Sequence, residues 1–243
     1  MNYWDKRAET WDLVGHPLRP NQEDLDIYKD LLSGTRDIVS LGATEEFKQI
    51  PGVSLFLDQS TEMLKRLGDP TDFFQKLRWE DWMGDDLFGA AICDGGLSCL
   101  NNEDSYRALA ANLYKELVPS GFFVVRIYLP ETRPNAASMP TDNPDLWKWR
   151  LVRTNASNYS GTGVRLGDVY NTWKLWNFVH PGQRGAEWIK TVECYKGSDE
   201  VYTFPSMERI IYLFAPWLRL EKMVIPSYED GEYFPICRFR STK

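Results

Sequence analysis

The 243 residues suffice for one α/β domain with an insertion, and 43% hydrophobic and 26% charged residues are ordinary for a globular protein. The 28 basic and 35 acidic side chains leave a formal net charge of -7, which repels a phosphate backbone and disfavours a nucleic-acid substrate. No run reaches the roughly 20 apolar residues of a membrane span, and residues 1–7 lack the apolar core of a signal peptide, so we expect a cytoplasmic protein without membrane contact.

The first half of the chain alternates helical patterns with short apolar runs. Residues 21–33 place apolar side chains on one helical face, between Asn21 in the position of a cap and a terminating Gly34. Several apolar runs end in a glycine or an acid, as buried parallel strands do beside a ligand. The expected elements are a helix at 21–33, strands at 37–42 and 53–58, a helix at 59–67, a strand near 76–79, a strand at 88–94, a helix at 103–117 and a strand at 122–129.

This alternation predicts a mostly parallel sheet with helices on both faces and ligands outside the carboxyl ends of its strands. Residues 130–205 then become rich in Trp, Asn, Tyr and Gly, with helical stretches near 144–153 and 167–179. We expect this segment to be an insertion that caps a substrate site. A helix at 207–214 and strands at 218–225 and 234–239 are expected to close the sheet.

Gly42 and Asp58 suit a nucleotide-type cofactor, because a glycine lets the backbone approach the ligand and a strand-end acid accepts ribose hydroxyls. Their separation is 58 − 42 = 16 residues, shorter than the ~20 typical of dinucleotide sites. The turn Leu41-Gly42-Ala43-Thr44-Glu45-Glu46 lacks two of the three glycines and places acids where a pyrophosphate would lie. These features favour a cofactor with a positive centre and no phosphate.

The motif series resembles that of class I S-adenosylmethionine-dependent methyltransferases over roughly residues 33–129. The matching segments are Leu41-Gly42-Ala43-Thr44-Glu45, Asp58 followed by Ser60 and Met63, Asp81-Trp82, Asp94-Gly95, and Leu117-Val118-Pro119-Ser120-Gly121. The N-terminal Trp4-Asp5-Lys6-Arg7-Ala8 with Trp11 is similar to a branch whose first motif is glycine-poor. The resemblance implies a Rossmann-like fold: one cofactor-binding domain over residues 1–243 with a mostly parallel seven-stranded sheet, a segment 1–33 that closes the cofactor site, and a helical cap at 130–205.

The resemblance also implies roles for individual residues. Asp58 would accept the ribose hydroxyls, Gly42 would face the methionine and ribose part, and Asp94 with Gly95 would bind the methionine ammonium. Arg19 would grip the methionine carboxylate through a bidentate pair. The full cofactor-binding set is Trp11, Arg19, Gly42, Thr44, Asp58, Gln59, Met63, Asp81, Trp82, Asp94 and Gly95.

Adenine would lie against Met63, with Asp81 at its amino group and Trp82 beside it. Each of these assignments has a purely structural alternative: strand-end acids also cap helices, Met63 and Trp82 are also suited to a core, and Arg19 also suits a surface ion pair. Four cysteines without a Cys-x-x-Cys pair, with only His16 and His180 to assist, predict no metal site.

Three functions remain open at this point. The first is methyl transfer to a small molecule, with Tyr170, Asn171 and Ser206 as the expected catalytic residues on the acceptor side. The second is a cyclisation in which the cofactor's own amine attacks its γ-carbon, which forms azetidine-2-carboxylate and releases methylthioadenosine. The third is a cofactor-binding domain without catalysis. The acceptor and the oligomeric state are not indicated by the sequence.

Overall fold

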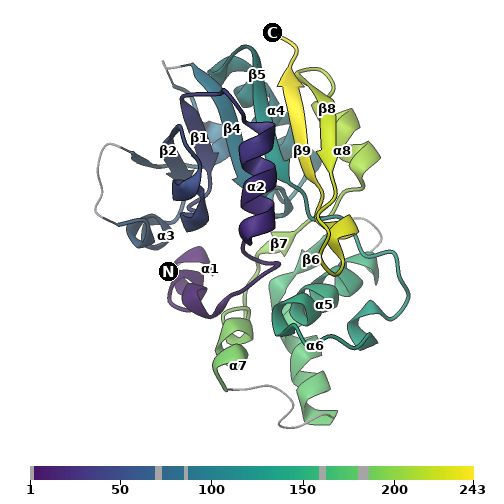
Figure 1. The fold of residues 1–243 in the computed structure, drawn as a ribbon. Helices are drawn as coiled ribbons and strands as arrows, with labels where there is room; N and C mark the ends of the chain where they lie inside the picture. Colours follow the sequence, from purple (N-terminus) through teal and green to yellow (C-terminus); the bar gives the residue numbers. More distant parts are fainter. Residues whose placement is uncertain (1–2, 69–72, 85–86, 159–162, 180–185) are drawn as a thin grey trace.

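The computed structural model describes residues 3–68, 73–84, 87–158, 163–179 and 186–243 (Figure 1). His180, singled out above, lies outside these residues. A seven-stranded sheet runs through the molecule in the order β3-β2-β1-β4-β5-β9-β8. Its parallel strands are β1 (Ile38–Leu41), β2 (Val53–Asp58), β3 (Phe74–Lys76), β4 (Phe88–Asp94) and β5 (Leu117–Arg126). β9 (Ile236–Ser241) lies antiparallel between β5 and β8 (Leu218–Val224), so the predicted mostly parallel seven-stranded sheet is confirmed.

Helices cover both faces of the sheet because successive strand residues point to opposite sides. Val124 packs on one face with the buried residues of α2 (Gln22–Leu31) and α3 (Thr61–Arg66). Val125 packs on the other face with α4 (Glu103–Glu116) and α8 (Met207–Phe214). Each of these helices begins at a side-chain cap, which satisfies a backbone N–H of the first turn. The caps are Asn21, Ser60, Asn102 and Ser206.

Two strands begin earlier in the chain than predicted. The strand expected near residues 76–79 is β3 at Phe74–Lys76, and the chain then makes a 3-10 turn over Trp79–Asp81. β5 begins at Leu117, directly after α4, and not at residue 122. The Pro-Ser-Gly sequence that suggested a break lies at a register shift against β4, with Ser120 at φ 59, so the strand bulges there and continues.

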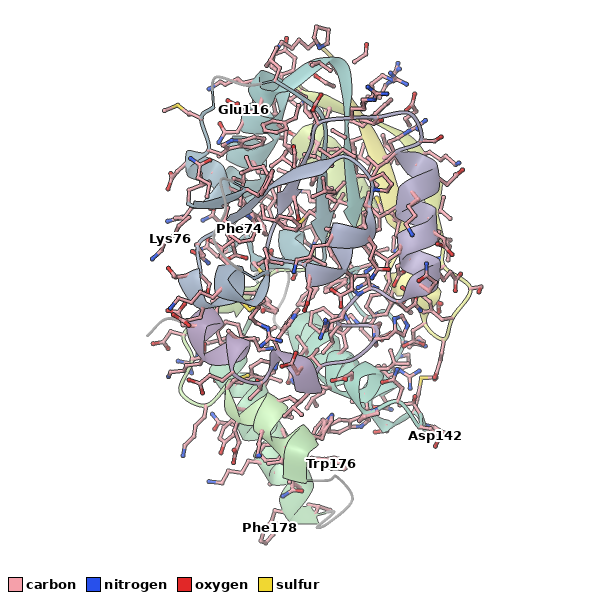
Figure 2. The ribbon with its side chains drawn as sticks, turned by 60° about the vertical axis from the view of Figure 1, so that its left-hand side comes forward. Phe74, Lys76, Glu116, Asp142, Trp176 and Phe178 are labelled. Carbon is pink, nitrogen blue, oxygen red and sulfur yellow. The ribbon has the colours of Figure 1, made fainter. Side chains whose placement is uncertain are left out.

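The remaining helices gather at the end of the sheet where β5 finishes and β9 begins, at the bottom of Figure 1. They are α1 (Tyr3–Ala8), α5 (Pro144–Asn158), α6 (Leu166–Val179) and α7 (Ala186–Glu193), with a small sheet of β6 (Val164–Arg165) and β7 (Val201–Tyr202). Tyr3, Trp149 and Val192 are buried in one aromatic cluster that joins three of these helices. Phe178, 83% exposed, lies at the tip of α6 far from the sheet (Figure 2).

A substrate-capping role for residues 130–205 stays a prediction. Two of the helices lie where helical spacing was expected, at 144–153 and 167–179, and α7 follows them. No helix among the described residues combines the length and apolar character that a membrane crossing needs.

Candidate functional site

A cavity of about 300 Å³ lies at the carboxyl ends of β1, β2 and β4. Its walls come from the turn after β1, the end of β2, the turn after β3, the loop after β4 and the N-terminal segment. This is the position at which open α/β sheets bind ligands, and the volume is at the lower end of the range for small-molecule sites.

The turn after β1 is fastened to the end of β2. Gly42 has φ +105, a conformation that strains any residue with a Cβ, and its N–H donates to Leu57 O at 2.7 Å. The next N–H, that of Ala43, donates to Asp58 Oδ2 at 3.0 Å. A glycine at this position therefore brings the backbone of the turn against the strand-end acid.

Asp58 is held as a hydrogen-bond acceptor facing the cavity. Its Oδ1 accepts from the N–H of Ser60 at 2.7 Å, and its Oδ2 accepts from Ala43. Burial raises the pKa of Asp58 to about 6, although these two backbone N–H groups act to lower it. Each carboxylate oxygen retains a further lone pair, so the group can accept the two hydroxyls of a ribose.

Asp94, at the end of β4, is bound by a buried arginine of β5. Arg126 donates to its two oxygens at 2.6 and 2.9 Å and to Asp24 of α2 at 2.8 Å. Burial raises the pKa of Asp94 to about 6, and the guanidinium acts against this rise. Asp24 and Asp94 thus share one buried guanidinium. Neither Arg126 nor Asp24 was identified from the sequence.

The cavity wall is acidic and aromatic. Four carboxylates line it, from Asp58, Glu80, Asp94 and Glu200, against the one guanidinium of Arg78 among the described residues. Three tryptophans also line it, and indole faces attract cations. These tryptophans are Trp4, Trp11 and Trp79. The wall therefore favours a positively charged ligand of small size.

The turn after β3 contributes Trp79 and Glu80, and not the expected Asp81 and Trp82. The Trp79 indole donates to Leu57 O at 3.0 Å, and its ring lies 2.4 Å from where a Cβ on Gly96 would stand. Trp82 is buried in the core against Phe88, and Asp81 is exposed beside Arg78. A 3-10 turn places these tryptophans in different environments, so the structure brings neither Asp81 nor Trp82 to the cavity.

The structure brings seven of the eleven predicted cofactor residues to the cavity wall: Trp11, Gly42, Thr44, Asp58, Gln59, Met63 and Asp94. Arg19 is not among them, because its guanidinium binds Glu46 at 2.6 Å and lies 5.7 Å over the Trp11 ring. Gly95 lies behind the wall at φ +65, where an added Cβ would stand 2.2 Å from the Tyr128 ring.

The three predicted catalytic residues also lie away from the cavity wall. Ser206 is exposed, and its hydroxyl accepts the N–H of Arg209 at 3.3 Å as the cap of α8. Tyr170 packs on Trp173 with ring centroids 5.5 Å apart, and Asn171 is exposed on α6. Ser206 is explained as a helix cap, and Tyr170 and Asn171 by their places on α6, without a role in chemistry.

The N-terminal segment is tied to the turn after β2 and to α3. The Ser60 hydroxyl donates to Asp5 of α1 at 2.8 Å, and Arg66 of α3 donates to the Ala8 carbonyl at 3.2 Å. Trp4 and Trp11 come from the same segment and line the cavity. Ser60 thus links the Asp58 turn to α1.

No protein-family model and no curated protein sequence matches the chain. Solved structures do match it along nearly its whole length. The CcbJ methyltransferase from Streptomyces caelestis has a TM-score of 0.61 at 13% identity, over 100% of this chain and 99% of that one. The N-methyltransferase NodS from Bradyrhizobium japonicum WM9, in complex with S-adenosyl-L-homocysteine, has a TM-score of 0.55 at 12% identity over 100% of both chains.

A protein described as a putative Zn-dependent alcohol dehydrogenase from Rhodobacter sphaeroides has a TM-score of 0.59 at 17% identity, over 98% of both chains. Among the described residues, no group of three or more His, Cys, Asp and Glu side chains is placed to hold a metal ion. The sheet order and these likenesses together show that the chain has the class I S-adenosylmethionine-dependent methyltransferase fold.

Proposed function

We propose that this chain binds S-adenosylmethionine and transfers its methyl group to a small-molecule acceptor. The observation that carries the proposal is the pair of partly buried carboxylates Asp58 and Asp94, which end the two strands beside β1 and line one acidic cavity. The fold supports it, and so does NodS, which has the same fold and was crystallised with S-adenosyl-L-homocysteine.

The residues present suit each part of that ligand. Asp58 would accept the ribose hydroxyls, and Asp94 would accept from the methionine ammonium while Arg126 holds its carboxylate in place. Met63 and Trp79 line the cavity and offer apolar surfaces for adenine, in place of the pair first expected after β3. The tryptophan faces and the acids suit a sulfonium.

When bound, S-adenosylmethionine supplies an electrophilic methyl carbon that carries its own thioether leaving group. The chain's task is therefore to orient the two reactants and to exclude water. Trp4 and Trp11, held over the cavity by the contacts of α1 with Ser60 and Arg66, provide that cover. This explains why the cavity needs no nucleophile–base pair of its own.

Calorimetry with S-adenosylmethionine tests the binding, and incubation with methyl-labelled cofactor tests the transfer. We expect one molecule bound per chain and label in an added acceptor. Absence of any heat would contradict the proposal. Methylthioadenosine released from cofactor alone, without an acceptor, would instead favour cyclisation, and binding without any product would favour a domain that only binds.

The affinity for S-adenosylmethionine is expected to fall in acid. Burial raises the pKa values of Asp58 and Asp94 to about 6, and a cationic ligand favours their ionised forms. Binding is therefore strongest above these pKa values and is lost as the pH falls through them. We expect Kd to rise about tenfold between about pH 7 and pH 5 for each group that must ionise, as calorimetry in matched ionic strength would show. A constant Kd across this range would contradict the role of the two carboxylates.

A further inference from the structure

Glu200 differs from the other three carboxylates of the cavity wall. Asp58 accepts two backbone N–H groups, Asp94 is bound by Arg126, and Glu80 lies 2.9 Å from Arg78. The Glu200 carboxylate has no hydrogen-bond or ion-pair partner among the described residues, and its backbone carbonyl is fixed by the N–H of Leu166 at 2.9 Å. The Glu200 side chain is exposed, so its carboxylate is available to a ligand at the cavity wall.

A second hollow, of about 320 Å³, adjoins this part of the cavity. Glu200 lines both spaces, and it is the residue they share among those described. α1 lies along the boundary, because Trp4 lines the cofactor cavity while its neighbour Tyr3 lines the second hollow. The loop after α7, from Gly197 onward, forms the opposite wall. A molecule in the second hollow would therefore meet the contents of the cavity at Glu200.

We infer that the second hollow receives the acceptor, that the acceptor is an amine, and that its nitrogen lies at the Glu200 carboxylate. This inference rests on the proposed function. The hollow is lined by the ammonium of Lys6 and by two carboxylates, of Glu200 and of Asp199, and Asp199 is paired with Arg165 at 3.2 Å. The Glu200 carboxylate, unpaired within the described part of the chain, repels an anionic acceptor such as a carboxylate or a phosphate ester. An N–H donor gives the free carboxylate the partner that it lacks.

The movement of charge during the reaction makes an amine especially suitable. The lone pair of a neutral amine forms a bond to the methyl carbon while the carbon–sulfur bond breaks, and the electrons of that bond remain on sulfur. Positive charge thereby moves from sulfur to nitrogen, and the surplus proton of the nitrogen then leaves to bulk water. A carboxylate beside the nitrogen stabilises this charge as it develops, and an electrostatic contribution of this kind amounts to about 10²–10³ in rate. The Leu166 contact holds the backbone of Glu200, from which the side chain lines both spaces.

The atom that receives the methyl group is the first test. The protein is incubated with ¹³C-methyl-labelled S-adenosylmethionine and a set of small amines, each matched by the alcohol and the carboxylate of the same carbon skeleton. The ¹³C shift of the product methyl identifies its attachment. We expect label on nitrogen. Label on oxygen, sulfur or carbon, or on none of the amines while the cofactor binds, overturns the inference, whereas failure to bind the cofactor overturns the proposed function itself.

Glu200→Gln is the second test. We expect the rate of amine methylation to fall about 100-fold, with the Kd for S-adenosylmethionine unchanged within about twofold, and Glu200→Asp to recover part of the rate. Glu193→Gln, the same change at an exposed residue of α7 that lines neither space, should match the wild type. An unchanged rate in Glu200→Gln, or an equal loss of rate and of cofactor affinity, contradicts the role given to Glu200.

Discussion

Asp58→Ala is expected to weaken S-adenosylmethionine binding about 100-fold, which corresponds to about 3 kcal/mol and to the loss of two hydrogen bonds to a charged acceptor. The carboxylate is the strand-end group that faces the cavity from β2, and its two oxygens are already oriented by the N–H groups of Ala43 and Ser60. Alanine removes the acceptors, and no neighbouring side chain of the described residues replaces them there. Calorimetry gives the change directly.

In Asp58→Ala the N–H groups of Ala43 and Ser60 lose their acceptor, which also affects the stability of the fold. The control must therefore separate a loss of binding from a loss of folding. Thermal unfolding without ligand shows whether the variant is folded at the temperature of the titration. Asp26→Ala removes an exposed carboxylate of α2 far from the cavity wall and should bind as the wild type does. A folded Asp58→Ala protein with wild-type affinity would refute the placement of the ribose.

Arg126→Met is expected to lower the free energy of unfolding by about 3–5 kcal/mol, because it leaves two buried carboxylates without their cation. The guanidinium is fully buried, as is Asp24, and Asp94 is 4% exposed at its side chain. Methionine fills much of the volume, so the loss is mainly electrostatic. Urea unfolding followed by tryptophan fluorescence or circular dichroism measures it.

The pH dependence of this loss identifies its cause. Burial raises the pKa of Asp94 and the guanidinium acts against this rise, so without Arg126 the pKa lies further above its unfolded value and the variant gains stability as Asp94 takes up a proton. The deficit should therefore shrink as the pH falls and grow as it rises. Arg107→Met, which breaks exposed pairs on α4, should cost less than about 1 kcal/mol at any pH. Equal losses in both variants would contradict this account of the buried cluster.

Most of the sheet was predictable because its strands are short apolar runs that end in recognisable residues. β1, β2 and β4 finish at or beside Gly42, Asp58 and Asp94, and all three of these residues line the cavity. In a parallel sheet the carboxyl ends meet at one edge, so identifying strands also located the site. Local pattern and global fold agree in this part of the chain.

The turn after β3 places Asp81 and Trp82 away from the cavity, and sequence alone does not fix the direction of a side chain in a short turn. Trp79 and Trp82 both flank acids, and two residues separate them. The turn buries Trp82 in the core and sends Trp79 to the cavity. Arg19 was misassigned for a different reason: its partner Glu46 lies 27 residues away, and only the folded chain brings the two together.

Arg126 is recognisable in the sequence as a charged residue inside an apolar strand. It stands within the apolar run 122–129, and a charged residue in such a strand must be buried with a partner or exposed at an edge. β5 lies inside the sheet between β4 and β9, so the arginine requires a buried carboxylate partner. Its partner Asp24 of α2 also accepts the Asn21 N–H at 3.0 Å as part of the helix cap. This capping role already explains an acid at that position, so the sequence does not reveal its contact with Arg126.

The place of β9 between β5 and β8 has a consequence for synthesis on the ribosome. β8 emerges before β9 yet lies at the edge of the sheet with β9 as its neighbour, so it stays unpaired until residues 236–241 are free. Met223 lies in β8 and Ile225 directly follows it, and both side chains are about half exposed even in the finished fold. Every described residue of the cavity wall precedes residue 201. The residues of the cavity wall are thus translated before β9, which completes the sheet. Until β9 emerges, the nascent chain exposes an unpaired sheet edge.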